Sequence, residues 1–524
     1  MRTLSCLLAI ALVGCAVPIE ESGVRPAPYK GSSQISPTST EVTLLGIEED
    51  RPYSTKDLND LTLSGRCLNS KATVEVKVGT KKMGSTTCGS DLTWKIDGMK
   101  FDSLSDGEVL LKVQQVGKTT ANAKKQIRAF KFSTEINPQQ TKIIGIGNTP
   151  ITQLSGGTKI ADLARLQEGY RDFKMSRFDF EFGRRGSDRQ LFWNPLETEI
   201  LPNLPADGSF QFQGWGDFGL PVGSSEMYEL NNQGALIPCG TSTSTGCAGT
   251  TYKTCTSSSA KCQDKYGYPA GGANGLAALR EYKWNQSLAE VKKFAGFMKK
   301  YPNLIKGATA DDTLKGRMKY VYIWKTRFQK MCQEAKAIYP NFKMDMVTYC
   351  HRTPLTAEGI TGEKNRYRAT SEGGALTDAQ INSIDWTKPT WEVEVVREYL
   401  KDPIISACVD SVQIFDMAYQ TTSTGETSMG RWTEQDYRNN ESCVGVLAND
   451  ANHKVIAGAY TASYKSLSFE DRVHNIEQVL KLTKKPNVIG ASFFQTPWVA
   501  ELPADSEEDE INEKVTKYLL QRLN

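Results

Sequence analysis

From about residue 140 to the end of the chain, short apolar segments alternate with helical patterns. Eight of these segments have strand character: 142–147, 174–182, 209–215, 317–324, 343–350, 411–419, 454–460 and 487–494. Parallel strands need long crossover connections, and helices usually supply them. The pattern therefore predicts an α/β fold over residues 140–524, a TIM-type (β/α)8 barrel. A doubly wound open sheet is the alternative.

Two of the helical patterns have clear limits. Ser468 and Asp471 begin one, in which Val473, Ile476 and Leu480 recur at helical spacing, and Pro486 follows its end. The other begins near Ser506, and its apolar face consists of Ile511, Val515, Leu519 and Leu523. Both are expected to pack on the sheet.

Residues 41–135 follow a different pattern, with apolar and polar residues alternating at period two. Gly, Asn, Asp and Ser interrupt the runs at short intervals, which is typical of an antiparallel all-β sandwich. LSGRCLNSKATVEVKVG, followed by a second cysteine before DLTWKI, resembles the small Ig-like modules of bacterial surface proteins. The resemblance implies a Cys67–Cys88 disulfide, whose loop of about twenty residues would stabilise the module by roughly 3 kcal/mol. Such modules act as spacers or adhesive units, and a spacer is favoured.

The first fifteen residues, MRTLSCLLAIALVGC, combine a positive charge with a short apolar run and a cysteine. They resemble the signal peptide and lipobox of bacterial lipoproteins. The resemblance implies cleavage before Cys15 and its modification by acyl chains such as palmitate. Residues 16–40 would then be a flexible tether, and the protein would be lipid-anchored in the bacterial cell envelope, at the outer membrane. The alternative is an ordinary secretory signal with a chance cysteine.

The composition bears on the class of binding partner and on whether the cysteines form disulfides. The 63 Lys and Arg nearly balance the 60 Asp and Glu, so no charge excess favours nucleic acid. Without Cys6 and Cys15, ten of the 12 cysteines remain, an even number that favours disulfides in an exported protein. With three histidines and no Cys-x-x-Cys pair, we expect no metal site and no cofactor.

Four cysteines fall in a Ser/Thr-rich insertion near residues 236–275, namely Cys239, Cys247, Cys255 and Cys262. They predict a disulfide-stapled surface loop, and three pairings are possible. Another four lie in the barrel region and are expected either to pair there or to remain small buried thiols: Cys332, Cys350, Cys408 and Cys443.

Several predicted strands end in polar or aromatic residues, which a barrel would gather at one face. The candidates for substrate binding are Trp215, Asp217, His351, Arg352, Tyr419, Gln420 and Trp498. Aromatic rings stack on sugar faces, while acids and amides bond hydroxyl groups, so the set favours a polysaccharide or other glycan as partner. The alternatives are ordinary aromatic residues at a barrel rim and, for His351, a hydrogen-bonded structural histidine.

The segment from Phe415 to Gln420 resembles the sixth strand of glycoside hydrolase family 18, the chitinase-like barrels, and GASFFQTPW is similar to that family's eighth strand. The resemblance implies a (β/α)8 barrel with a sugar site floored by Trp498. The family's acids lie on strand four. The segment assigned here to that strand, 317–324, contains no carboxylate. Gln420 also replaces the aspartate expected after Tyr419.

Strand two offers other acids in the stretch SRFDFEFGRR. Alternation puts Asp179 and Glu181 on one face of this strand and the phenylalanines on the other. We therefore expect Glu181 to be the general acid and Asp179 to modulate it. The alternative is a structural ion network with Arg177, Arg184 or Arg185.

These observations predict a surface-anchored lipoprotein with a carbohydrate-active barrel. Its expected activity is that of a glycoside hydrolase on an envelope or environmental polysaccharide. Two other functions compete with it: a non-catalytic glycan-binding or adhesive protein on a degenerate chitinase-like barrel, and a structural envelope lipoprotein.

Overall fold

The computed structural model places most of the chain in two compact units. One comprises residues up to 48, 60–99 and 111–126; the other comprises 49–59, 100–110 and 127–524. The described residues are 40–136, 141–148, 151–153, 159–161, 177–181, 202, 210–215, 227–230, 236–240, 261–263, 269–271, 288–289, 291–311, 325–352, 354–368, 376–417, 419–421, 427–448, 453–460, 467–494 and 506–523. The predicted signal peptide, Cys15 and nearly all of the predicted tether lie outside them.

The N-terminal strands form two sheets. One has the order β1 (Pro52–Ser54), β7 (Lys124–Phe132), β6 (Gly107–Gln115), β3 (Thr73–Val78) and β4 (Lys81–Thr87). The other pairs β2 (Leu61–Arg66) with β5 (Thr93–Met99) in antiparallel fashion. In the first sheet β3 is antiparallel to both β4 and β6, whereas β1 and β7 are parallel. The predicted disulfide between Cys67 and Cys88 is present, with 6.2 Å between the two Cα atoms.

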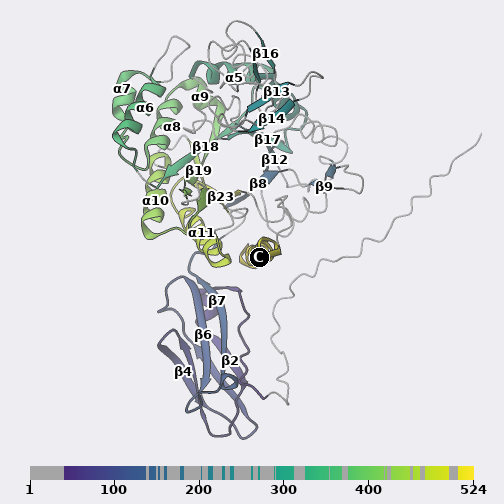
Figure 1. Cartoon of the computed structure of the whole chain (residues 1–524), viewed down its shortest axis with the longest axis vertical. Helices are drawn as coiled ribbons and strands as arrows, with labels where there is room; N and C mark the ends of the chain where they lie inside the picture. The colour runs from purple at the N-terminus through teal and green to yellow at the C-terminus, as the bar shows by residue number, and fades with distance from the viewer. Residues whose placement is uncertain are drawn as a thin grey trace, which may run out of the picture. The chain divides into compact units, whose positions relative to one another are not determined.

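Eight parallel strands form a closed barrel in sequence order (Figure 1). They are β8 (Lys142–Asn148), β11 (Arg177–Glu181), β12 (Phe210–Trp215), β17 (Ile305–Asp311), β18 (Met344–His351), β19 (Val409–Met417), β22 (Lys454–Tyr460) and β23 (Val488–Phe494). β8 pairs with both β11 and β23, which closes the sheet. Seven of the eight predicted strand segments overlap these strands.

The fourth strand was predicted at the wrong place. It is β17, Ile305–Asp311, whereas residues 317–324 lie outside the described residues. The predicted strand four had no carboxylate, but β17 ends in Asp311. The inference that strand four has no acid is therefore wrong.

Helices follow the last five strands, as the sequence pattern predicts. They are α5 (Lys325–Ile338), α6 (Ala357–Tyr367), α7 (Asp378–Ser383), α8 (Trp391–Leu400), α9 (Pro403–Cys408), α10 (Glu434–Ala448), α11 (Phe469–Leu482) and α12 (Ser506–Leu523). The predicted start of α11 is confirmed, because the Ser468 side chain accepts a hydrogen bond from the Asp471 amide. Of the residues that the structure describes, none belongs to a helix long and apolar enough to cross a membrane.

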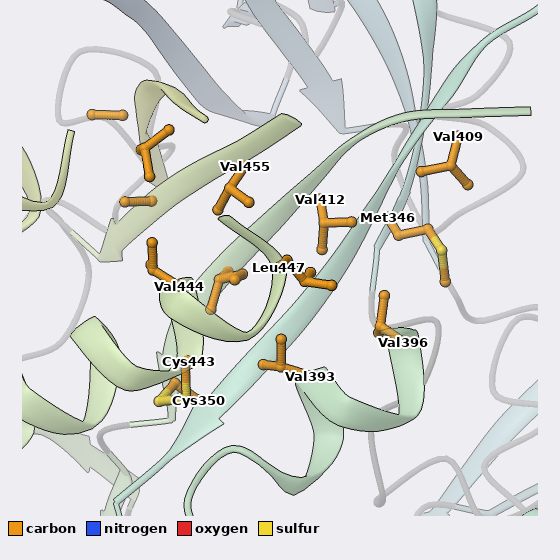
Figure 2. Close-up of a cluster of buried hydrophobic side chains, with 14 of the residues drawn as sticks. Met346, Cys350, Val393, Val396, Val409, Val412, Cys443, Val444, Leu447 and Val455 are labelled. Atoms are coloured by element: carbon orange, nitrogen blue, oxygen red, sulfur yellow. A yellow bond between two sulfur atoms is a disulfide. The ribbon is translucent and has the colours of Figure 1, made fainter. Parts of the chain in front are cut away.

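The barrel core lies between the strands and the helices (Figure 2). Apolar side chains of β18, β19 and β22 pack there against α8 and α10, among them Met346, Val393, Val396, Val412, Leu447 and Val455. The four cysteines of this region form two disulfides, Cys332–Cys408 and Cys350–Cys443. The second joins the end of β18 to α10 within the core.

Four short antiparallel strand pairs lie outside the barrel sheet: β9 (Ile151–Gln153) with β10 (Lys159–Ala161), β13 (Met227–Leu230) with β14 (Leu236–Gly240), β15 (Lys261–Gln263) with β16 (Pro269–Gly271), and β20 (Tyr419–Thr421) with β21 (Thr427–Met429). The predicted insertion near 236–275 therefore includes β14, β15 and β16. The pairing of its four cysteines falls outside what the structure describes.

Candidate functional site

The carboxyl ends of the eight barrel strands meet at one face, because all the strands run in the same direction. The last residues of the strands, in barrel order, are Asn148, Glu181, Trp215, Asp311, His351, Met417, Tyr460 and Phe494. Two acids, an amide and four aromatic or imidazole residues therefore begin the loops on this face. It is the candidate active site.

Strand register shows which positions face the barrel interior. Ile143, Ala491, Ala457 and Ile414 are cross-strand partners of one another in turn, and all four belong to the apolar core that includes the helices. Side chains alternate between the two faces of a strand, so the next positions face inward. These are Ile144, Ser492, Gly458 and Phe415, which also pair in turn.

The positions of Asp179 and Glu181 belong to the inward rows. Residue 177 pairs with Ile144, residue 179 with Ile146 and residue 181 with Asn148 on β8. Phe178 and Phe180 pair with Gly145 and Gly147, in the rows that face the helices. The register therefore has the alternation that SRFDFEFGRR predicts.

Rows of paired residues do not run level around a barrel, because its strands are tilted by about 36°. From one strand to its neighbour, about 4.8 Å away, the row of paired residues shifts along the barrel axis by roughly the length of one residue. Inward positions therefore form layers of four from alternate strands. The register assigns one layer at the carboxyl ends to Glu181, Asp311, Phe415 and Phe494.

Asp311 is the residue that the sequence analysis missed. Its position in this layer is separated from that of Glu181 by one strand, β12, and its backbone pairs with Trp215 at the end of that strand. Two strand spacings put the backbones of Glu181 and Asp311 about 10 Å apart. A sequence signal existed: strands and helices of such barrels are joined by about two to six residues, so a strand was due soon after Pro302.

Polar side chains continue below this layer. Asp345 near the start of β18 and Gln413 of β19 are fully buried, and Gln413 Nε2 donates a hydrogen bond to Asp345 Oδ2 at 3.3 Å. Ser411, the cross-strand partner of Asp345, is also fully buried. Bulky branched apolar residues usually fill this volume in such barrels. The interior of this one is polar well below the mouth.

His351, predicted to bind substrate, is held by protein partners. Its Nε2 lies 2.9 Å from Oε2 of Glu392 at the start of α8, and its ring stacks on Trp391 with centroids 4.7 Å apart. Glu392 is fully buried and also accepts hydrogen bonds from the Thr348 hydroxyl and the Tyr349 amide. These contacts favour the hydrogen-bonded structural histidine, the alternative that the sequence left open.

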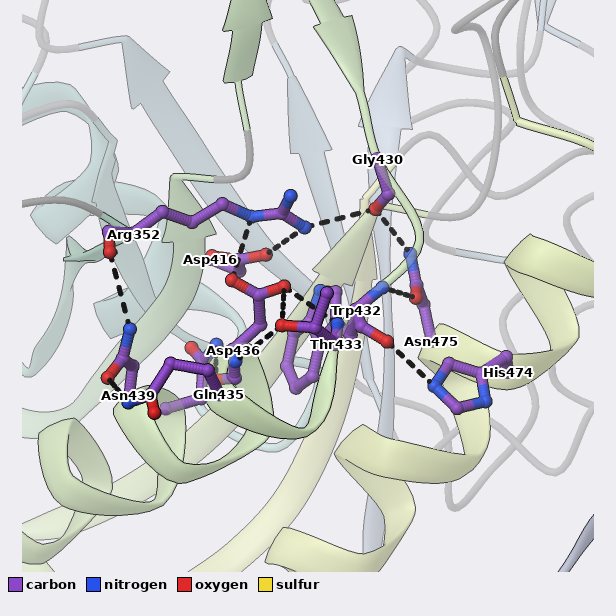
Figure 3. A network of polar contacts seen from close by, with 11 residues as sticks. Arg352, Asp416, Gly430, Trp432, Thr433, Gln435, Asp436, Asn439, His474 and Asn475 are labelled. Carbon is purple, nitrogen blue, oxygen red and sulfur yellow. Dashed lines mark hydrogen bonds and ion pairs between the residues drawn. The ribbon is translucent and has the colours of Figure 1, made fainter.

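Arg352 is the centre of a polar network between β18, β19 and α10 (Figure 3). Its guanidinium lies 3.5 Å from Oδ2 of Asp416 and 3.2 Å from Oδ1 of Asp436, and Nη2 donates to the Gly430 carbonyl at 3.1 Å. Asp416 belongs to the strand face that packs on the helices, since Val412 and Ile414 precede it at every second position. Arg352 and Asp416 therefore lie beneath the helices, outside the barrel interior.

Burial raises the pKa of Asp416 to about 7, and the nearby Asp436 carboxylate adds to the effect. The Arg352 guanidinium and a hydrogen bond from Asn440 oppose it. Asp436 is held differently, because its Oδ2 accepts hydrogen bonds from both the amide and the hydroxyl of Thr433 at 2.7 Å. Asp416 is thus the member of this network that takes up a proton near neutral pH.

The structure describes some of the remaining predicted site residues and not others. Trp215 is the last residue of β12. Tyr419 and Gln420 lie on β20, which pairs with β21 and is not a barrel strand. The sixth strand instead runs from Val409 to Met417, so the predicted strand 411–419 is shifted by two residues toward the C-terminus. Asp217 and Trp498 lie outside the described residues.

Comparisons with known proteins give only distant structural likeness. No family model and no curated protein sequence matches the chain. The solved structures that resemble it include a GH5 xyloglucanase of Bacteroides ovatus in complex with a heptasaccharide (10% identity, TM-score 0.34, 91% of this chain and 100% of that chain). Another is a mutant of Xylanase10C from Cellvibrio japonicus in complex with xylopentaose (12% identity, TM-score 0.34, 94% and 95%).

A third is a calcium-binding mutant of Bacteroides uniformis β-glucuronidase 2, at 9% identity and a TM-score of 0.33. The likeness covers 87% of this chain but 46% of that one. At these TM-scores the likeness carries no argument about the substrate or mechanism of this chain.

Proposed function

We propose that the barrel of this chain is a glycoside hydrolase and that Glu181 and Asp311 are its catalytic carboxylates. One feature carries the proposal: the strand register, combined with the usual tilt of barrel strands, assigns the positions of both residues to a single inward layer at the carboxyl ends of the strands. In barrels of this kind that face carries the chemistry, and conserved structural roles lie at the other. The corrected strand four, IKGATAD, ends in an acid, although the acid motif of family 18 is still absent from it.

The chemistry of glycosidic bond cleavage needs two carboxyl groups on opposite sides of the bond. One protonates the leaving oxygen, and the other activates a water or attacks the sugar. Carboxyl groups that leave room for a water are about 6.5–9.5 Å apart, and those of the covalent mechanism about 5–5.5 Å apart. Backbones about 10 Å apart on strands two and four suit the first arrangement, since both side chains start from one layer.

Asp179 precedes Glu181 by two residues on the same face, roughly 6.6–7 Å along the strand. Two carboxylates that share a site disfavour each other's ionised form. Glu181 is therefore assigned as the general acid, with Asp179 as its modulator and Asp311 as the base. This assignment replaces the earlier expectation in which both acids came from one strand.

Aromatic positions around the same layer support a sugar as substrate. Trp215 ends β12 between the two acids, Tyr460 ends β22 and Phe494 ends β23. Sugar rings present C–H faces that stack on aromatic side chains. We propose an envelope or environmental polysaccharide as the substrate, and a lipid anchor at Cys15 with the N-terminal strands as spacer.

A non-catalytic glycan-binding protein is the second candidate, favoured by the positions of Tyr419 and Gln420 on a strand pair outside the barrel. An array of oligosaccharides distinguishes the hydrolase from the glycan-binding protein. It is offered to the mature chain with Cys15→Ser and to the Glu181→Gln and Asp311→Asn variants of that chain. The hydrolase proposal predicts cleavage products from the parent chain and retained binding without products from both variants. Asp410→Asn is the matched control, because Asp410 lies at the far end of β19 and pairs with Lys454 at 3.2 Å.

Binding without cleavage by the parent chain would leave the glycan-binding protein. Absence of binding to every sugar would leave a structural envelope lipoprotein.

A further inference from the structure

Two buried carboxyl groups and a partly buried arginine meet where β18, β19 and α10 join. Arg352 carries one positive charge, whereas Asp416 and Asp436 could carry two negative charges. Asp416 is 2% exposed and Asp436 6% exposed, so an unbalanced charge here would be poorly solvated. Burying a charge without a partner is costly, and the two carboxyl groups are therefore expected to retain one proton between them.

The contacts indicate which carboxyl group holds the proton. Asp436 lies closer to the guanidinium, at 3.2 Å against 3.5 Å for Asp416, and accepts two hydrogen bonds from Thr433. Asp436 therefore has two neutral donors besides the guanidinium. Asp416 Oδ2 has no hydrogen-bond partner among the described residues. The proton belongs on Asp416, in agreement with its raised pKa.

One nitrogen of Arg352 links this proton to a neighbouring segment. Nη2 contacts Asp416 Oδ2 and also donates to the Gly430 carbonyl at 3.1 Å. The same carbonyl accepts from Asn475 of α11 at 3.3 Å, and Asn475 Oδ1 accepts from the Trp432 amide at 2.8 Å. Residues 430–433 are thus held between Arg352 and α11 (Figure 3).

We propose that Asp416, Asp436 and Arg352 form a proton-binding site that controls how residues 430–433 are held against α11. When the proton leaves, the Asp416 carboxylate attracts Nη2 more strongly and competes with the Gly430 carbonyl for it. The hydrogen bond to Gly430 then weakens, and the environment of Trp432 changes. The device is independent of the proposed hydrolase activity.

Other titratable groups touch the same region and define the controls. From α11, His474 Nε2 bonds the Trp432 carbonyl at 3.0 Å, and Asp471 pairs with Arg431 at 3.4 Å. The pKa of His474 is lowered by burial and by the charge of Arg431. From α8, Glu392 pairs with His351, the residue before Arg352. A pH effect at residues 430–433 could therefore arise at His474, and the experiment must separate it from Asp416.

Trp432 is 4% exposed and serves as the reporter. The fluorescence emission of Trp432 is the emission of the mature chain minus that of its Trp432→Phe variant. Both are measured from pH 5 to pH 9. We expect the emission to change with a midpoint near 7, as the Asp416 carboxyl ionises. Asp416→Asn should abolish the change, whereas His474→Gln, which keeps a hydrogen-bond donor, should retain it.

A transition that persists in Asp416→Asn, or one lost in His474→Gln, would overturn the proposal. If Asp416→Asn does not fold, amide hydrogen exchange of the parent chain decides. The Trp432 amide should lose protection, after correction for intrinsic exchange, between pH 6 and pH 8, while the Val412 amide in β19 does not. An equal loss of protection at the Trp432 and Val412 amides would contradict the proposed proton-binding site.

Discussion

The two faces of β18 and β19 have opposite chemistry although they belong to the same strands. The face toward the helices carries Met344, Met346, Val412 and Ile414, and the Cys350–Cys443 disulfide ties it to α10. The face toward the barrel interior carries Asp345, Gln413, Ser411, Tyr349 and Phe415. The outer face therefore supplies most of the hydrophobic stabilisation, and the inner face keeps polar groups near the proposed site.

Polar groups do occur on the outer face, but they are bound to one another. Glu392 accepts hydrogen bonds from Thr348 and Tyr349 and contacts His351, while Arg352 pairs with Asp416 and Asp436 and donates to Gly430. Such groups stabilise the strand ends only while every partner is present. The comparison predicts that changes on the outer face alter stability, whereas changes at the inner mouth alter activity.

The largest stability effect is expected at Glu392. Glu392→Ala leaves the Thr348 hydroxyl, the Tyr349 amide and the His351 ring without their acceptor in a buried setting, which typically costs about 3–5 kcal/mol. Urea unfolding of the mature chain measures the loss. Glu434→Ala is the control, since 76% of the Glu434 side chain is exposed. Similar losses in the two variants would contradict a structural role for Glu392.

The second predicted effect is a dependence of the free energy of unfolding on pH, caused by Asp416. Asp416 keeps its proton in the folded chain up to about pH 7, whereas the unfolded side chain ionises near the ordinary aspartate pKa of 3.8. The free energy of unfolding should therefore fall as the pH rises from about 4 to about 7, by at most about 4 kcal/mol, and level off above. Asp416→Asn should remove that fall.

The measurement is the difference in unfolding free energy between pH 4.5 and pH 8 for parent and variant. An equal difference in both chains would show that Asp416 does not retain the proton.

A smaller effect is expected at Gly458, on the inner face of β22. A Cβ atom added there would lie 2.6 Å from ring carbons of Phe415, which shares the layer of Glu181 and Asp311. Gly458→Ala should cost about 1–3 kcal/mol through overpacking. Gly445→Ala on α10 is the matched control, because nothing lies within 4 Å of the added Cβ atom. A larger drop in the thermal unfolding midpoint for Gly445→Ala than for Gly458→Ala would contradict the inner-face packing.

Much of the fold followed from sequence periodicity. The start of α11 at Ser468 is present, and seven strands overlap their predicted segments. The Cys67–Cys88 bridge, which the resemblance to Ig-like modules implied, is also present. β17 was missed because its sequence, IKGATAD, is small and weakly apolar, while the aromatic run at 317–324 gave a stronger signal. Strand propensity measures how well side chains pack, so a strand of small residues scores poorly.

The candidate site was less accessible to sequence reasoning. Asp311 could be recognised only once β17 was placed, because its role depends on the strand that carries it. Glu392 pairs with a histidine 41 residues earlier in the chain, and periodicity gives no information on such contacts. Arg352 was predicted at the mouth, but the alternation of β18 and the position of α10 turn it toward Asp436.

The central claim is that Glu181 and Asp311 cleave glycosidic bonds from one layer of the barrel. Its most direct test is the rate of oligosaccharide hydrolysis by the mature chain, Glu181→Gln and Asp311→Asn, with unfolding midpoints measured in parallel. The account predicts a loss of at least about 100-fold in each variant, with little change in the unfolding midpoint. Undiminished hydrolysis in either variant would contradict it.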